Sequence, residues 1–348
     1  MTIPTTLNSL PERKKFRIIP PIETFPRFVN FAQTPLGKCF VLIVFGLGFK
    51  SFVQDRRLLF LIVGCLGLTT FWPKRQRPLL ALSTILVSAF EMRSLSFLAV
   101  IALGLLLFWC ARKWPHSMFA RRPVAILLSG YSLALLAVCA IHKESPLYSP
   151  SWAAIGLVSG YIWFIAYALS DRNASLRNDL SLEAGTFHPF WGSTNTPYPK
   201  GAAYLRRIEA SDSKQLAMCQ LKGLKLLAWA LLLAILQAQW MSIFHTRLHI
   251  PLSSDALAMS VRRNPYPWYV CWESQLLVFF EYLLEISILG HKIIACCRMV
   301  GFNALRNTYR PLSSTTLIEF FNRFYYYFKE LLVDFFLSNL SALFQAAS

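Results

Sequence analysis

The chain has 348 residues, of which 55% are hydrophobic and only 15% are charged. A typical soluble domain is about 25% charged, so this composition excludes a disordered chain, a collagen-like fibre and a small disulfide scaffold. It also disfavours a soluble nucleic-acid-binding protein, although 35 Lys and Arg residues against 17 Asp and Glu give a net charge of +18. The composition predicts a polytopic membrane protein, whose excess of cations indicates its topology.

The chain is expected to hold two regions. Residues 1–38 are basic and rich in proline, and no secretory signal opens them, which is typical of a cytosolic or interfacial arm. Residues 39–348 contain no internal repeat, so they are expected to form a single all-α transmembrane helix bundle with a C-terminal amphipathic helix. The eight cysteines show neither a C-x-x-C nor a paired Cys/His spacing, and therefore predict no metal site.

About eight apolar segments follow in chain order. A transmembrane helix needs about 20 mostly apolar residues. Five segments come close to this length: 94–111, 123–142, 152–169, 224–245 and 268–290. Three earlier runs are shorter, and they either cross with the help of flanking residues or form re-entrant pairs: 39–53, 58–72 and 78–92.

Positive charge predicts the orientation of these segments, because cytoplasmic loops carry an excess of Lys and Arg. With a cytosolic N-terminus and every segment crossing, 25 of the 35 Lys and Arg residues lie on the cytosolic side and 7 lie outside. The largest cytosolic stretch is the loop 170–225. Its run of glycine, proline and aromatic residues predicts an ordered loop close to the membrane.

Residues 314–345 are expected to form one strongly amphipathic helix. At 100° per residue, charged and tyrosine side chains fall on one face and Phe and Leu on the other. Glu319 and Arg323 are four residues apart and can pair. Two interpretations remain open: the helix lies flat on the bilayer, or its polar face lines a water-filled reaction chamber inside the membrane.

Residues 287–334 read SILGHKIIACCRMVGFNALRNTYRPLSSTTLIEFFNRFYYYFKELLVD. They can be laid without gaps along a known pattern that reads roughly S-G-Y-S-D-I-A-I-G-L-A-R-L-F-G-F, then P-x-N-F-N-R-P-Y, then S-L-x-E-F-W-R-R-W-H-I-S-L-S-x-W-F-R-D. Twelve residues match it: Ser287, Arg298, Gly301, Phe302, Asn307, Arg310, Pro311, Leu317, Glu319, Phe320, Arg323 and Asp334. On these residues the chain resembles the membrane-bound O-acyltransferase (MBOAT) family, in particular the bacterial branch that acylates polysaccharides and teichoic acids. The stretch GTFHPFWGSTNTPYPK also resembles that family's cytosolic F-P-x-x-x-x-G-P loop.

The resemblance implies transfer of an acyl group from a thioester, acyl-CoA or an acyl carrier protein, to a hydroxyl of an envelope glycan or lipid. It implies an integral protein of the bacterial inner (cytoplasmic) membrane that holds no bound cofactor and no metal and binds no nucleic acid. The implied partners are the lipid bilayer and an extracytoplasmic acyl acceptor protein. The reaction needs a base for the hydroxyl proton, and histidine suits it because its pKa is about 6.5.

The resemblance also places the candidate site. Tyr325 stands where many relatives carry a histidine, and Asn322 lies on the same polar face, so these two are the candidate catalytic residues. A tyrosine donates a hydrogen bond but is a poor base, because its pKa is about 10. The candidate substrate-path residues are Tyr326, Lys329, Glu281, Glu285 and His291.

Each of these residues also has a structural interpretation. Glutamates inside an apolar segment are costly, so Glu281 and Glu285 are expected either to pack in a polar interior or to line a path. The run Tyr325–Tyr327 is equally typical of an aromatic belt at the membrane interface. His245 and His249 straddle the end of a segment and are expected to anchor it rather than to bind metal.

Only 14 residues follow Asp334, and none of them is histidine. The chain is therefore expected to be C-terminally truncated relative to the family and to need a membrane partner that supplies the missing helices. The alternative is a non-enzymatic membrane scaffold or partner subunit of an acylation complex. A secondary transporter is disfavoured, because the sequence shows no inverted halves with broken spans.

Overall fold

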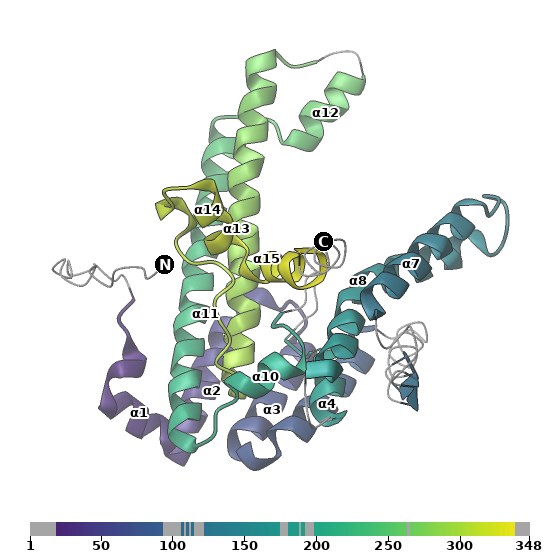
Figure 1. The fold of residues 1–348 in the computed structure, drawn as a ribbon. Helices are drawn as coiled ribbons and strands as arrows, with labels where there is room; N and C mark the ends of the chain where they lie inside the picture. Colours follow the sequence, from purple (N-terminus) through teal and green to yellow (C-terminus); the bar gives the residue numbers. More distant parts are fainter. Residues whose placement is uncertain are drawn as a thin grey trace, which may run out of the picture.

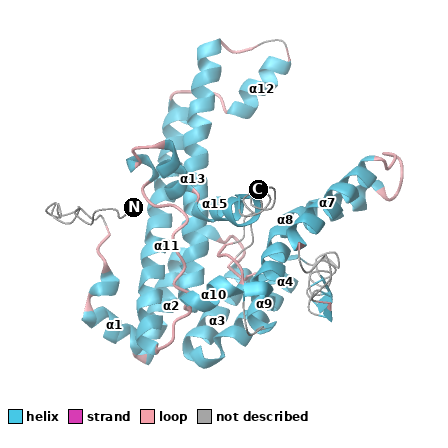
Figure 2. Cartoon of the chain, in the orientation of Figure 1, coloured by secondary structure: helices cyan, strands magenta, loops and turns pink. Residues whose placement is uncertain are grey.

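The computed structural model describes residues 19–92, 106–107, 109–110, 113–114, 122–174, 180–187, 189–191, 198–262 and 265–337. Every regular element in these ranges is a helix, which confirms the all-α prediction (Figure 2). The two longest helices, α11 (Ser213–Met241) and α13 (Trp268–Val300), run antiparallel and side by side through the molecule (Figure 1). Gly223 permits this close approach, since a Cβ there would lie 3.1 Å from the carbonyl oxygen of Ala295.

The N-terminal helices pack against the lower part of this pair. α1 (Pro26–Gln33) and α2 (Pro35–Phe49) each begin with a proline, which suits the first helical turn because that turn needs no N–H donor. Both helices contact α11. Residues 22–33 of the expected basic arm are thus folded onto the helix pair rather than separate from it.

Two short helices form a sharp bend. α3 (Arg56–Phe71) and α4 (Gln76–Met92) meet at the turn Pro73–Arg75 and are bent by 109° at that break. Proline at the turn removes a backbone donor and prevents a continuous helix. A bend of this size is that of a broken span or of a re-entrant loop. The re-entrant loop is one of the two arrangements expected for the runs 58–72 and 78–92.

A second helix pair extends away from the central pair. α7 (Pro123–Cys139) and α8 (Tyr148–Ala174) form this hairpin, and α9 (Leu180–Phe187) then packs against α4 (Figure 1). α10 (Ala202–Ile208) follows and contacts both α8 and α9.

The prediction that residues 170–225 form a loop was wrong over its last part, because α11 already begins at Ser213. Asp212 starts the helix: its side chain accepts a hydrogen bond from the Gln215 amide at 2.7 Å, which satisfies one of the free donors of the first turn. Beyond Met241 the chain passes through a π-helical turn, Ser242–Arg247, and the short helix α12 (Ser253–Val261).

The prediction of one continuous amphipathic helix over 314–345 was also wrong. The structure holds two short helices, α14 (Leu317–Phe324) and α15 (Tyr326–Leu332), followed by a π-helical turn at Val333–Leu337. Residues 338–345 lie outside the described residues. The break falls at Tyr325, where the backbone leaves the helical region.

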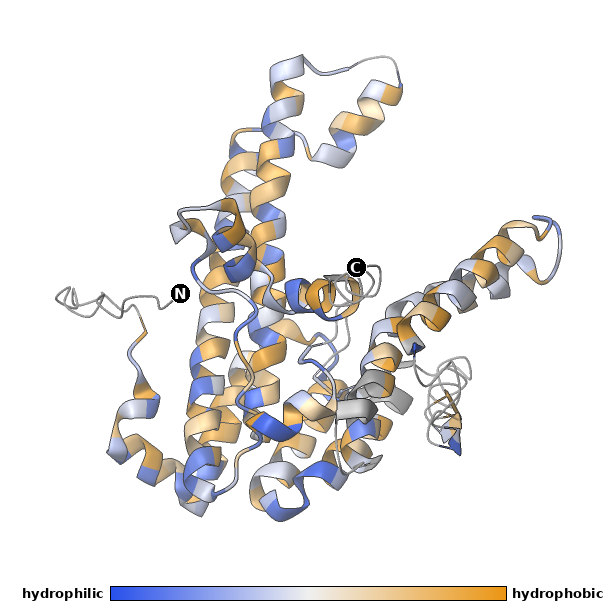
Figure 3. Cartoon of the chain, viewed as in Figure 1, coloured by the Kyte–Doolittle hydropathy of each residue, from blue (hydrophilic) through white to orange (hydrophobic). Residues whose placement is uncertain are grey.

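In the part of the chain that the structure describes, three helices are long and apolar enough to cross a membrane: Pro35–Phe52, Tyr148–Tyr167 and Ser213–Arg247. The bent pair makes a fourth if it counts as one span, and Val124–Cys139 is shorter. Apolar residues run along α7, α8, α11 and α13 in Figure 3. These helices indicate membrane association.

The described residues nevertheless contain fewer long apolar helices than the eight apolar segments expected. Most of the segment 94–111 lies outside the described residues. The segment 268–290 is helical as part of α13, but it carries three glutamates, which lower its mean hydropathy.

Candidate functional site

The break between α14 and α15 is held open by the segment 307–309, which runs beside it. In a continuous helix the carbonyls of Arg323 and Phe324 would accept hydrogen bonds from amides four residues later. Here the Tyr309 amide donates to Arg323 O at 2.8 Å, and the Thr308 hydroxyl donates to Phe324 O at 2.8 Å. Backbone groups released by the break are therefore paired with another part of the chain, as buried polar groups require.

Asn307 completes this exchange from the other side of the break. Its backbone oxygen accepts from the Tyr326 amide at 3.0 Å, and its side-chain oxygen accepts from the Tyr327 amide at 3.2 Å. Asn307 is 1% exposed, so both bonds are shielded from water. One side chain thereby fixes the direction in which α15 starts.

Three aromatic rings close over Asn307, and we call Tyr198, Tyr325, Tyr327 and Asn307 the tyrosine cluster. The Tyr198 and Tyr325 rings stack with centroids 6.2 Å apart, and Tyr198 meets Tyr327 edge-on at 5.2 Å. Tyr198 lies in the loop before α10, so the cluster joins that loop to the helix break. Burial raises the pKa of both Tyr198 and Tyr327 above the ordinary tyrosine value, and both phenols stay protonated as hydrogen-bond donors.

Two polar atoms in this cluster are enclosed and form no close hydrogen bond with a described residue: the Tyr198 hydroxyl and Nδ2 of Asn307. Tyr325 and Asn307 nevertheless lie near enough to the Tyr198 hydroxyl to act on its pKa, which Tyr325 raises and Asn307 lowers, so the hydroxyl has weak partners within the cluster. α13 passes close by, because a Cβ at Gly290 would lie 2.9 Å from that Nδ2. Buried donors without close partners are rare in proteins and each requires an explanation. Two such donors beside one another could hold a carbonyl oxygen or the oxyanion that forms from it.

A charged network lies next to the tyrosine cluster. Lys200 contacts Glu330 at 2.5 Å and Asp334 at 2.9 Å, and Tyr167 of α8 donates to Asp334 at 2.9 Å. Burial alone lowers the pKa of Lys200, but hydrogen bonds and charge from the two acids outweigh burial and raise it above the ordinary value. Burial raises the pKa of Glu330, but hydrogen bonds from Lys200 and Lys329 outweigh it, so the net shift is downward. The network joins α8, the loop before α10 and α15.

The structure brings together three of the residues expected from the sequence. Tyr325 belongs to the tyrosine cluster, and Tyr326 packs edge-on against Tyr327 with ring centroids 5.2 Å apart. Lys329 pairs with Glu330 at 2.7 Å and lies over the Tyr326 ring. All three follow the break, so their common location is due to the break and not to a single helical face.

The other expected residues lie apart from this cluster. Asn322 is exposed on α14, on the other side of the break. Glu285 is exposed on α13. Glu281 forms a pair with Nε2 of His245 at 2.7 Å, where the end of α11 meets α13.

The pair of His245 and Glu281 does not form a general base. Nδ1 of His245 also lies 2.8 Å from the carbonyl oxygen of Ile250, so both ring nitrogens face acceptors. Only a doubly protonated ring donates to both. The pair is therefore a clamp between two helices, which fits the anchoring interpretation of His245 and the packing interpretation of Glu281.

His291 is buried on α13, one residue after Gly290. Its Nδ1 lies 2.6 Å from the carbonyl oxygen of Ser287 and must donate to it, because a carbonyl only accepts. In a neutral ring, Nε2 then carries the free lone pair. Burial, together with the charges of Arg306 and Arg298, lowers the pKa of His291 to about 4, so the ring is neutral near pH 7 and is a weak base.

Sequence reasoning missed Tyr198, Lys200 and the role of Asn307. Asn307 does match the family pattern, and Tyr198 and Lys200 lie in the loop that resembles the family's cytosolic loop. A contact between this loop and the stretch 287–334 would have pointed to these three residues. The sequence does not give the distance between the two motifs, so it could not show that contact. Among the described residues, no group of three or more His, Cys, Asp or Glu side chains is arranged to hold a metal ion.

No family model, curated protein or solved structure matches the chain. The functional interpretation therefore depends on the geometry of the tyrosine cluster and on the sequence resemblance alone.

Proposed function

We propose that the chain is a membrane O-acyltransferase of the MBOAT type, and that the tyrosine cluster holds the thioester carbonyl of its acyl donor. The observation that carries this proposal is the pair of enclosed polar groups, the Tyr198 hydroxyl and Nδ2 of Asn307, whose contacts with each other and with Tyr325 fall short of close hydrogen bonds. Support comes also from the resemblance over residues 287–334, which surrounds the cluster from α13 to α15.

The reaction would proceed by attack of an acceptor hydroxyl on the carbonyl carbon of the thioester. The new C–O bond forms and the C–S bond breaks, so the products are an ester and a free thiol. The hydroxyl proton passes first to a base and then to the departing sulfur. In this proposal the proton acceptor is Nε2 of His291, a weak base because its pKa is lowered to about 4, and the Tyr198 hydroxyl and Asn307 Nδ2 would stabilise the negative charge on the carbonyl oxygen.

The proposed orientation has a cytosolic N-terminus in a bacterial inner membrane. Three stretches expected on the cytosolic side lie against one another: Gln76 donates to Val300 O at 2.5 Å, and the Asn303 amide donates to Ile208 O at 2.9 Å. The His245–Glu281 clamp lies at the other end of the central helix pair. The grouping supports a common side for these stretches, and the positive-inside rule makes that side cytosolic.

An acyl-transfer assay tests the proposal. The full chain in proteoliposomes would receive radiolabelled acyl-CoA and an extract of bacterial envelope lipids and glycans. We expect label in the extract, and a loss of about 10²-fold when one of the donors to the oxyanion is removed, as in Tyr198→Phe. Tyr325→Phe and Asn322→Ala test the two catalytic residues expected from the sequence. Tyr309→Phe is the matched control, because Tyr309 is 51% exposed.

Folding is checked separately by thermal melting. Tyr198→Phe removes a hydroxyl that forms no close hydrogen bond with a described residue, so the melting temperature should fall only slightly. Full transfer activity in this variant would refute the assignment of the tyrosine cluster.

A second candidate is a non-enzymatic partner subunit of an acylation complex. The observation in its favour is the apolar outer surface of α14, where Leu317 is 72% and Ile318 is 77% exposed. A membrane partner that supplies further helices could cover these side chains, and so could lipid. Absence of label transfer by the chain alone, with transfer restored by a co-purified membrane protein, would favour this candidate.

A further inference from the structure

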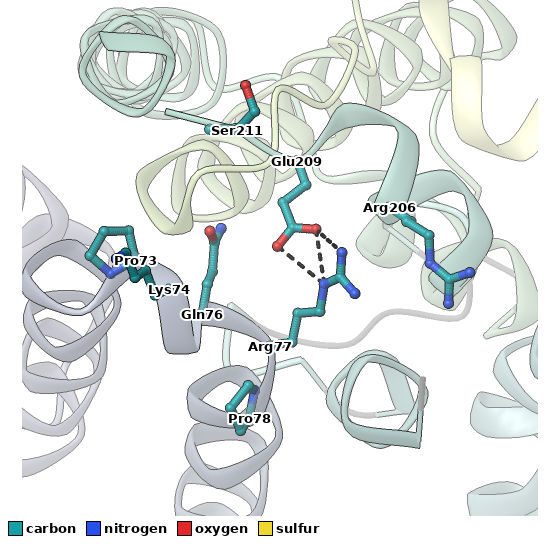
Figure 4. A pocket seen from close by; sticks show the side chains of 9 residues that line it. Pro73, Lys74, Gln76, Arg77, Pro78, Arg206, Glu209 and Ser211 are labelled. Atoms are coloured by element: carbon teal, nitrogen blue, oxygen red, sulfur yellow. Dashed lines mark hydrogen bonds and ion pairs between the residues drawn. The ribbon is translucent and has the colours of Figure 1, made fainter. Parts of the chain in front are cut away.

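A polar pocket lies near the C-terminal end of α13, where Gln76 donates to Val300 O. It has a volume of about 540 Å³ and is lined by the turn between α3 and α4 and by the end of α10 with the connection to α11 (Figure 4). Its charged lining residues are Lys74, Arg77, Arg206 and Glu209. These residues come from two parts of the chain more than 120 positions apart, so only the fold brings them together.

The pocket contains more positive than negative charge. Arg77 and Glu209 neutralise each other through a two-point pair, in which Nε and Nη2 of Arg77 lie 3.0 and 2.7 Å from one oxygen of Glu209. Figure 4 shows this pair crossing the pocket, with Arg206 beside it on α10. Lys74 and Arg206 remain as two cations that form no ion pair with any described residue.

Arg206 supplies a second and independent observation. Its Nε is enclosed and has no hydrogen-bond partner among the described residues. A buried donor of a charged group is costly when it is left unpaired. Arg206 as a whole is half-buried, so the terminal nitrogens of its guanidinium, rather than the enclosed Nε, are the groups that can meet an acceptor in the pocket.

Two lining residues, Gln76 and Ala210, also hold the C-terminal end of α13. The Gln76 side chain donates to Val300 O, and the Ala210 amide donates to Gly301 O at 2.9 Å. These bonds satisfy two carbonyls at the negative end of the helix, which would otherwise repel an anion more strongly.

We propose that this pocket binds a phosphate group. The flat fork of arginine and the point charge of lysine are the side chains that suit phosphate oxygens. The volume lies in the usual range for small-ligand sites of about 300–1,000 Å³ and exceeds the need of a bare ion, so the phosphate is carried by a larger molecule. Two sources share this chemistry: the headgroup of an anionic lipid and a soluble phosphate ester. The inference stands apart from the proposed acyl transfer and does not depend on it.

Binding is tested on the full chain in nanodiscs of phosphatidylcholine, with inorganic pyrophosphate as the probe and calorimetry as the readout. The test variant is Lys74→Ala with Arg206→Ala, which leaves the pair of Arg77 and Glu209 intact. We expect affinity to fall at least about tenfold. The matched control is Lys143→Ala, an exposed cation in the turn between α7 and α8 that should leave affinity unchanged.

A second arm distinguishes the two sources. Native mass spectrometry would detect phosphatidylglycerol retained by the purified chain. Retention by the wild type but not by the double variant, together with loss of pyrophosphate binding in phosphatidylglycerol nanodiscs, assigns the pocket to a lipid headgroup. Undiminished pyrophosphate binding in those nanodiscs assigns it to a soluble ester.

Three results would overturn the proposal: neither probe binds the wild type, the double variant binds as tightly as the wild type, or Lys143→Ala weakens binding equally. Arg206→Lys guards against a folding defect, because it keeps the charge and loses the fork. It should melt as the wild type does and bind with intermediate affinity. Since no acyl transfer is measured, failure here leaves the proposed function untouched.

Discussion

The C-terminal half of α13 and the helix α7 of the α7–α8 hairpin are both rich in apolar residues but have opposite surroundings, and the uncharged α7 is the more exposed of the two. In α13, Ala295, Cys296 and Met299 are all 0% exposed. In α7, Leu133 and Leu136 are each 67% exposed. Hydropathy alone does not separate these two regions, because it records what a side chain prefers and not what covers it.

Polar side chains explain much of the difference. Around α13, the Gln220 side chain donates to Thr70 Oγ1 at 2.8 Å and to Met299 O at 3.1 Å. Arg298 donates through two nitrogens to Ala304 O, at 3.0 and 2.7 Å. Buried bonds of this kind fix one packing arrangement. The α7–α8 hairpin extends away from the central pair in Figure 1, and lipid is the medium expected to cover its exposed leucines.

The largest expected effect is at the end of α13. Gly301 has φ of 113°, and a Cβ there would lie 2.7 Å from the Gln76 side chain and 2.9 Å from Leu216. Gly301→Val combines backbone strain with overpacking, and should lower the free energy of unfolding by about 2–4 kcal/mol. Thermal melting in detergent measures it. Melting within experimental error of wild type would mean that this turn is not as tightly packed as the structure indicates.

The next effect is at the helix break. Asn307→Leu leaves the Tyr327 amide buried without its acceptor, and should cost about 1–3 kcal/mol. The control is Asn322→Ala, an exposed change expected to stay within about 0.5 kcal/mol. Denaturation in detergent compares the two variants. An equal cost at both asparagines would show that the break is not held by Asn307.

The charged network should give a smaller effect that depends on pH. Lys200→Met removes two charge-assisted hydrogen bonds from half-buried groups and should cost about 1–2 kcal/mol near neutral pH. The lowered pKa of Glu330 means that its contribution is present above the unfolded pKa of about 4.3 and is lost as pH falls through the native value.

The raised pKa of Lys200 acts at the alkaline end, where its contribution is lost as pH rises above about 10.4. Melting of wild type and variant from pH 3 to 9 should therefore show a constant difference above about pH 5 and a shrinking one below about pH 4. A difference that does not depend on pH would mean that packing, not charge, is what Lys200 contributes.

The smallest effect is expected on α7. Leu136→Gln alters an exposed side chain and should change stability in detergent by less than about 0.5 kcal/mol. The same change should reduce insertion into a bilayer, where a polar group at an apolar position is costly. Melting and membrane-insertion assays measure the two effects. A large loss in detergent would show that protein, not lipid, covers this face.

Much of the fold could be predicted from the sequence. Apolar runs with few charges determined an all-α chain, and the segments 123–142 and 152–169 correspond to α7 and α8. Local chemistry also determined several boundaries: Pro73 marks the bend, and Asp212 and Gly301 mark where α11 starts and α13 ends. The amphipathic pattern correctly identified an apolar face in the C-terminal stretch.

Only the tertiary structure decided where that stretch breaks. The intrinsic pattern from Leu317 to Leu332 favours one helix, because each turn can satisfy its own backbone. Asn307, Thr308 and Tyr309 offer the same backbone groups other partners, and the chain must fold back between residues 310 and 316 to bring those three residues beside the break. The tyrosine cluster and the cationic pocket have the same origin. Both join motifs far apart in sequence, and their distances follow from packing around α13 rather than from any local preference.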